Sequence, residues 1–111
     1  MDIISDEYVD VNDALRRIGG SMDLYKRLLG QFAGGDHIGP LEAAFESGDS
    51  EDASRKLHAL KGVSANLSLI KLSEIASALE YMVKDGVDHT TLFEELKGVY
   101  DITLQQIAEI I

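Results

Sequence analysis

The chain has 111 residues. This length fits one domain, spanning residues 1–111, with a single hydrophobic core. Its net charge of −10 comes without a basic stripe, which argues against nucleic acids and anionic membranes as partners. The lack of cysteine excludes disulfides, thiolate metal sites and cysteine nucleophiles, and it suits a reducing, cytoplasmic compartment. No stretch approaches the roughly 20 consecutive apolar residues of a membrane span.

The N-terminal part of the chain predicts an acidic arm and two helices. Residues 1–10 carry acidic side chains and no base, and we expect a loose or lightly docked arm there. Apolar side chains on one edge of residues 11–18 predict a short helix with Asn12 as its cap, ended by two glycines. Ser21 is the expected cap of the next helix.

A breaker-rich stretch follows at residues 34–40, where three glycines and a proline should break or kink a helix. Apolar periodicity resumes beyond it and ends at Gly48. Residues 21–48 therefore form either two helices or one long kinked helix, and the sequence leaves both open.

The remaining chain predicts three amphipathic helices. Their apolar positions recur with a helical period over residues 49–67, 71–84 and from residue 90 onward, with Thr91 and Glu94 as a capping box for the last. No run shows the alternation typical of a strand. Because these stripes must be buried on one another, the predicted fold is all-α, an antiparallel four-helix bundle with a short extra N-terminal helix.

One histidine stands on the outer face of a predicted helix. A helical wheel of residues 49–67 places His58 about 150° from the centre of the apolar stripe. Lys61, Gly62 and Ala65 follow at i+3, i+4 and i+7 on the same side. A glycine inside a helix costs about 0.8–1 kcal/mol relative to alanine. Gly62 therefore calls for a reason, such as the close approach of another surface.

This arrangement suits phosphoryl transfer as well as an ordinary solvated surface. A neutral imidazole nitrogen is a good nucleophile near neutral pH, and Lys61 could neutralise charge on phosphoryl oxygens. The sequence holds no nucleotide-binding loop, no paired metal-ligand histidines and no hydrolase nucleophile pattern. Any ATP or metal chemistry would have to come from a partner.

The segment of residues 58–67, His-Ala-Leu-Lys-Gly-Val-Ser-Ala-Asn-Leu, resembles the signature of histidine-containing phosphotransfer (HPt) domains. Similarity extends on both sides and covers most of residues 12–85. Ser68 stands where the family usually has glycine, and as a helix cap it should be tolerated. Ala65 replaces a frequent glycine, and the glycine-rich stretch at 34–40 is unusual for the family.

The resemblance implies a role for each matching residue. His58 would be the phospho-acceptor and Lys61 would stabilise the phosphoryl group, while Gly62 and Ala65 would admit a partner's loops. Asn66 also matches the pattern, and Arg55 with Lys61 keeps the docking face from being acidic. The implied partners of this monomer are response-regulator receiver domains and a hybrid or sensor histidine kinase. It would need no cofactor of its own, since Mg²⁺ is expected on the receiver.

Other functions remain open at this stage. The bundle could be an adaptor that docks a receiver or kinase domain without chemistry. A small metal or acid–base enzyme is disfavoured because the sequence shows no buried carboxylate–histidine set. His37 and His89 lack the motif, and we expect ordinary surface roles for them.

Overall fold

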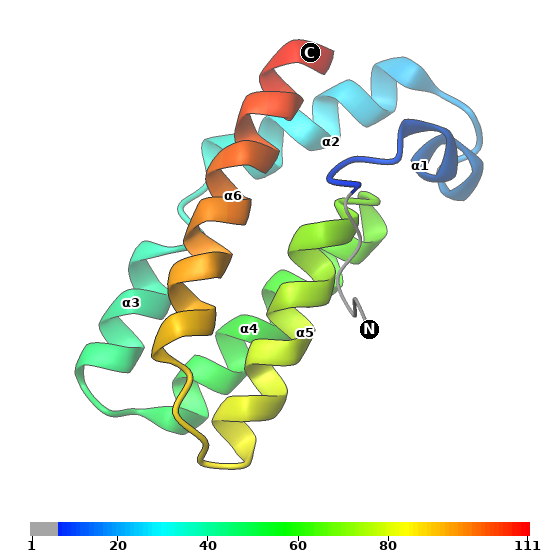
Figure 1. The fold of residues 1–111 in the computed structure, drawn as a ribbon. Coiled ribbons are helices and arrows are strands. Elements are labelled where there is room, and N and C mark those ends of the chain that lie inside the picture. The colour runs from blue at the N-terminus through cyan, green and yellow to red at the C-terminus, as the bar shows by residue number, and fades with distance from the viewer. Residues whose placement is uncertain (1–6) are drawn as a thin grey trace.

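The computed structural model describes residues 7–111, which form six α-helices and no strand (Figure 1). The helices are α1 (Val11–Arg17), α2 (Met22–Gly34), α3 (Gly39–Glu46), α4 (Ser50–Asn66), α5 (Ile70–Lys84) and α6 (Thr90–Ile110). The predicted all-α class is confirmed. Within the described residues, no helix has both the length and the apolar character needed to cross a membrane.

The helices form the predicted four-helix bundle, in which two short helices in succession, α2 and α3, take the place of one long helix (Figure 1). The helix α4 packs on α5 and α3, and α6 packs on α5 and α2. The helices α2 and α3 together supply the fourth member of the bundle, and α1 is the short extra helix beside α2. The core consists of the apolar stripes, whose largest fully buried side chains include Tyr25, Leu29, Leu41, Leu57, Leu69, Leu72, Ile75, Leu79, Leu96 and Ile107.

Residues 21–48 form two helices, which resolves the choice that the sequence left open. Gly35 ends α2 in an extended conformation with ψ of 158°. The Asp36 carboxylate then accepts hydrogen bonds from the backbone N–H groups of Ile38 (3.2 Å) and Gly39 (2.9 Å). Pro40 lies in the first turn of α3, where its missing N–H is tolerated. The break between α2 and α3 is therefore an ordered turn that the Asp36 side chain stabilises.

The helix starts agree only in part with the predicted caps. Ser21 caps α2 as expected, since its Oγ accepts from the Leu24 N–H at 3.2 Å. The prediction for α1 is wrong, because the cap is Asp10 and not Asn12. The Asp10 side chain accepts from the Asp13 N–H at 3.0 Å, which satisfies a free donor of the first turn.

The predicted capping box of α6 is also wrong. This helix begins at Thr90, one residue early for Thr91 to be its cap, and within the described chain no side chain caps it from His89. The Asp88 carboxylate accepts instead from the backbone N–H of Thr90 at 3.1 Å and from its hydroxyl at 2.9 Å. An Asx-type turn at Asp88 therefore satisfies the first turn of α6 in place of the predicted capping box.

Part of the predicted acidic arm is docked. Residues 1–6 of that arm lie outside the described residues. Tyr8 and Val9 pack against the core, and the ammonium group of Lys71 lies 4.8 Å from the centroid of the Tyr8 ring. The Asp10 N–H donates to the Ser68 carbonyl at 3.0 Å. Residues 8–10 are therefore docked, which is the second of the two predicted alternatives.

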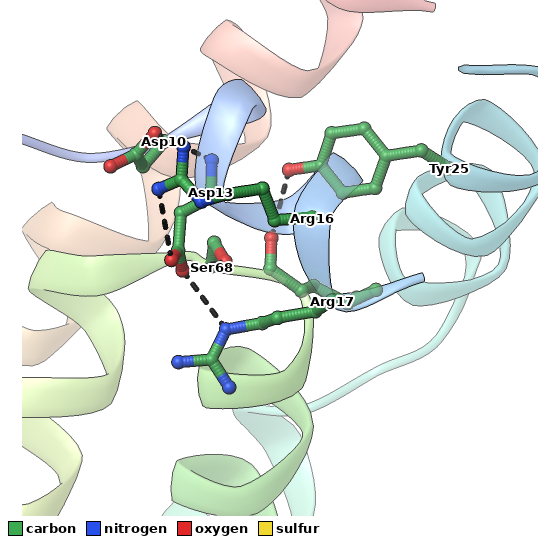
Figure 2. A network of polar contacts seen from close by, with 7 residues as sticks. Asp10, Asp13, Arg16, Arg17, Tyr25 and Ser68 are labelled. Atoms are coloured by element: carbon green, nitrogen blue, oxygen red, sulfur yellow. Dashed lines mark hydrogen bonds and ion pairs between the residues drawn. The ribbon is translucent and has the colours of Figure 1, made fainter. Parts of the chain in front are cut away.

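The turn after α4 is held by a polar network, which Figure 2 shows. Ser68 has a left-handed backbone with φ of 55°, and its hydroxyl donates to Asp13 Oδ2 at 2.7 Å. Arg17 donates to the same Asp13 oxygen at 2.9 Å. The Tyr25 hydroxyl donates to the Leu67 carbonyl at 2.8 Å. Ser68 thus ties the end of α4 to α1, and the predicted role of its side chain as a helix cap is wrong.

Candidate functional site

His58 lies at the middle of α4 and faces away from the core. Asp49 caps the start of this helix, since its side chain accepts from the Asp52 N–H at 3.0 Å, and acids in the first turn complement the helix dipole. Its inner face is buried through Ala53, Leu57, Leu60 and Ser64. The side chain of His58 is 68% exposed, as the helical wheel predicts.

A buried carboxylate lies directly beside this exposed ring. Glu80 comes from α5, and its side chain is only 6% exposed. Its Oε2 lies 3.3 Å from His58 Nδ1, so the second ring nitrogen, Nε2, is left without this partner. Only the carboxylate of this pair is buried, so the pair is not a buried carboxylate–histidine set of the kind that a core enzyme would need. The pair lies at the α4–α5 surface instead of inside the core.

Two lysines neutralise the Glu80 carboxylate. Lys61 Nζ lies 3.1 Å from Glu80 Oε1, and Lys84 Nζ lies 3.0 Å from Oε2. Burial raises the pKa of Glu80, but ion-paired hydrogen bonds from Lys84 and then Lys61 outweigh it and bring that pKa below its ordinary value. Glu80 is therefore a carboxylate at neutral pH and acts only as a hydrogen-bond acceptor.

Sequence reasoning missed Glu80 and Lys84. Both lie at one flank of the apolar stripe of α5, where a charged side chain is ordinarily solvated. Their contact with His58 depends on how α5 is aligned along α4, and helical periodicity carries no information on that alignment. The one signal in the sequence is the position of Glu80 at the edge of the apolar stripe of α5.

A shallow groove of about 570 Å³ adjoins the four-residue cluster of His58, Lys61, Glu80 and Lys84. Gly62 and Ala65 line its α4 side, and Ser73, Ser77 and Ala78 line its α5 side. No described atom outside the helix backbone lies within 4 Å of where a Cβ on Gly62 would stand. The glycine is therefore not required by packing within this chain, and its wall of the groove is open to another surface.

The other two predicted docking residues are placed differently. Arg55 is exposed on α4 and pairs with Asp52 at 3.1 Å, beside a pocket that it shares with Lys84. Asn66 is the last residue of α4 and lines a different cavity, of about 460 Å³, together with residues of α2. The structure therefore brings Gly62 and Ala65 beside the cluster but separates Asn66 from it.

The other two histidines are partly exposed and pack against neighbouring aromatic rings. His37 is half-buried, stacks on the Phe32 ring at 4.2 Å and donates from Nε2 to the Phe32 carbonyl at 2.9 Å. His89 is half-buried and lies 4.6 Å from the Phe45 ring. Among residues 7–111, no group of three or more acidic, histidine or cysteine side chains could hold a metal ion.

Comparison with known proteins identifies the family of the chain. The family model described as Hpt domain matches residues 33–109, which include His58, the lysine pair and the whole of α4 to α5. This match reaches further toward the C-terminus than the similarity seen in the sequence, and it begins after most of α2. Searches of curated proteins and of solved structures gave no match. The chain belongs to the Hpt domain family, whose members transfer phosphoryl groups through histidine in two-component relays.

Proposed function

We propose that this protein is a phosphorelay carrier that accepts a phosphoryl group on His58 from a receiver-domain aspartyl phosphate and passes it to another receiver. Hpt domains are carriers that work with receiver domains and histidine kinases, and they are not enzymes with their own ATP site. The observation that carries the proposal is the contact of 3.3 Å between the exposed His58 ring and the buried Glu80 carboxylate.

This contact selects the reactive nitrogen. Because a carboxylate only accepts hydrogen bonds, it favours the tautomer with the proton on Nδ1 of His58. The lone pair then lies on Nε2. A freely exposed histidine would divide its proton between the two nitrogens, so Glu80 is a positioning residue that favours one of them.

The transfer itself is an in-line displacement. The Nε2 lone pair of His58 attacks phosphorus, the bond from phosphorus to the receiver's aspartate oxygen breaks, and the aspartate leaves as a carboxylate. The ring now carries a positive charge, with its Nδ1 proton beside Glu80. Mg²⁺ on the receiver would neutralise the phosphoryl oxygens, and the reverse reaction would deliver the group to a second receiver.

Docking of the receiver uses the open groove. We assign Gly62 and Ala65 to the surface that the receiver's active-site loops approach, since Gly62 has free space around it. Arg55 lies on the edge of this surface, and Asn66 belongs to it only if the receiver reaches around the end of α4. The proposal places the protein as a monomer in the cytoplasm, which the lack of cysteine suits.

Labelling from a phosphorylated receiver tests this function. Each of a panel of receiver domains, phosphorylated at its aspartate, is incubated with the wild-type protein and with His58→Gln. Label should pass to the wild-type protein, be absent from His58→Gln and be lost in acid, because phosphohistidine is acid-labile. His37→Gln and His89→Gln are matched controls that should still be labelled. Label on His58→Gln, or binding of a receiver without any transfer, would contradict the proposal, and binding alone would indicate an adaptor.

A further inference from the structure

We infer that Lys84 is a positioning residue that holds the Glu80 carboxylate, so that Lys61 is free to move onto the phosphoryl group. The inference deepens the proposed function and rests on it. It starts from an unexpected feature of the described structure, which is that the lysine beside His58 is already engaged by a carboxylate.

Lys61 is not available to a phosphoryl group in the resting structure. Its Nζ lies 3.1 Å from Glu80 Oε1, and its side chain is 34% exposed. If Lys61 left this contact and no other cation replaced it, the Glu80 carboxylate, which is only 6% exposed, would lose its charge partner. A buried charge that loses its partner is strongly unfavourable. Lys61 can therefore move only if another cation stays with Glu80.

Lys84 supplies that cation from the same helix as Glu80. It stands one turn later on α5, at i+4, and its Nζ lies 3.0 Å from Oε2, the oxygen that also faces His58 Nδ1. Because Lys61 uses the other oxygen, the two lysines do not compete for one atom. Two ammonium groups thus face one carboxylate, and one positive charge is left over beside the reactive ring.

That surplus charge is local, in a chain whose net charge is −10. The groups that face the cluster are Lys61 with nearby Arg55 and Glu51 on α4, and Glu80 and Lys84 with nearby Glu74 on α5. Without Lys84, Lys61 would be needed to neutralise Glu80. The phosphoryl group would then lose its lysine partner.

The first test is made on the unphosphorylated protein. The carboxyl carbon of Glu80 is followed by ¹³C NMR during an acid titration, in the wild-type protein and in Lys84→Met. The pKa of Glu80 should be higher in Lys84→Met, because the Lys84 ion pair is the largest factor lowering it. Lys84→Arg should restore the low pKa. An unchanged pKa in Lys84→Met would overturn the inference.

The second test measures the rate of phosphoryl transfer from a phosphorylated receiver. Lys84→Met should slow transfer by about fivefold, the effect expected for one partly exposed ion pair. Lys84→Arg should recover most of this rate, and Lys26→Met, which removes an exposed lysine on α2, should transfer like the wild-type protein.

Combination with Glu80→Gln separates holding Glu80 from direct contact with the phosphoryl group. In Glu80→Gln there is no carboxylate to hold, so adding Lys84→Met should cause no further slowing. A further slowing in that background, or wild-type transfer by Lys84→Met alone, would overturn the inference while leaving the carrier function intact. Failure of the wild-type protein to accept any phosphoryl group would instead refute the proposed function, and this inference with it.

Discussion

His58 Nδ1 lies 3.3 Å from Oε2 of Glu80, so an exposed ring on α4 is paired with a buried carboxylate on α5. The pairing joins the two helices of the site at one point. It also makes the reactive surface dependent on a charge that the protein keeps away from water. The proposed chemistry and the acid stability of the fold are therefore linked through Glu80.

Glu80→Gln should make the protein less stable at neutral pH but not in acid. Its lysine partners lower the pKa of Glu80 in the folded state. The carboxylate therefore stabilises the fold above the unfolded-state pKa of about 4.3, and this contribution is lost as pH falls through the lower folded-state pKa. We expect Glu80→Gln to lower the free energy of unfolding by about 1 kcal/mol at pH 7, after allowing for solvent screening at the partly exposed lysines.

Urea denaturation at several pH values tests this expectation. The difference between the wild-type protein and Glu80→Gln should shrink toward zero as the pH is lowered below about 4. Glu95→Gln is a matched control on the exposed side of α6 and should show little difference at any pH. A difference that stays constant into acid would show that Glu80 is not stabilised as a carboxylate.

Gly62→Ala should stabilise the protein, because the added methyl group would meet no described atom outside the helix backbone. The expected gain is about 0.8–1 kcal/mol in the free energy of unfolding. Gly62→Gln should also fold but should weaken receiver binding, since its side chain would project into the groove. Gly98 on α6 is the matched control, because it too has open space in mid-helix but lies outside the site.

The pair of glycine substitutions separates stability from docking. Gly98→Gln should leave receiver affinity, measured by isothermal titration calorimetry, at the wild-type value. Equal affinities for Gly62→Gln and the wild-type protein would mean that the receiver does not approach this part of α4.

Sequence predicted the bundle and the face of α4 that carries His58, but it could not predict the site in full. Apolar periodicity is local, so it located the helices and showed which way His58 points. The Glu80 and Lys84 contacts depend on the alignment of two helices, which no single-helix pattern records. The stacking of His37 on Phe32 could not be predicted for the same reason, since it arises only when α2 ends and the chain turns back. The cap of α1 was missed because Asp10 and Asn12 are both good caps.

Ser68→Ala should destabilise the protein more than Ser68→Gly. Both substitutions remove the hydroxyl bond to Asp13, which we expect to contribute about 1–2 kcal/mol. Only glycine also relieves the left-handed backbone at φ of 55°, which costs other residues about 1–2 kcal/mol. In urea denaturation followed by circular dichroism, Ser68→Gly should remain near the wild-type protein. Equal losses for the two variants would show that the backbone at this turn is not strained.

Tyr25→Phe should lower the free energy of unfolding at neutral pH. It should also reduce the loss of stability that occurs as the pH rises above about 10. The Tyr25 hydroxyl donates to the Leu67 carbonyl at 2.8 Å, a buried bond that we expect to contribute about 1 kcal/mol. Burial raises the pKa of Tyr25 to about 12. The unfolded chain ionises first, at about pH 10, so stability is present below that pH and is lost as the pH rises toward the folded value.

Thermal unfolding between neutral pH and pH 11 tests this behaviour. Tyr25→Phe should unfold earlier at neutral pH and lose less stability on going to pH 11. Some alkaline dependence should remain, because burial also raises the pKa of Tyr100. A wild-type protein and a Tyr25→Phe variant with parallel pH profiles would contradict the account of the buried hydroxyl.

The most direct test of the central claim is to find which atom carries the phosphoryl group. The ¹⁵N-labelled protein is phosphorylated by a receiver domain and studied by ¹⁵N and ³¹P NMR, which distinguish the two phosphohistidine isomers. We expect one phosphohistidine, at His58, with phosphorus bonded to Nε2 and the proton retained on Nδ1 beside Glu80. Phosphorus on Nδ1 of His58, or on any other residue, would contradict the account.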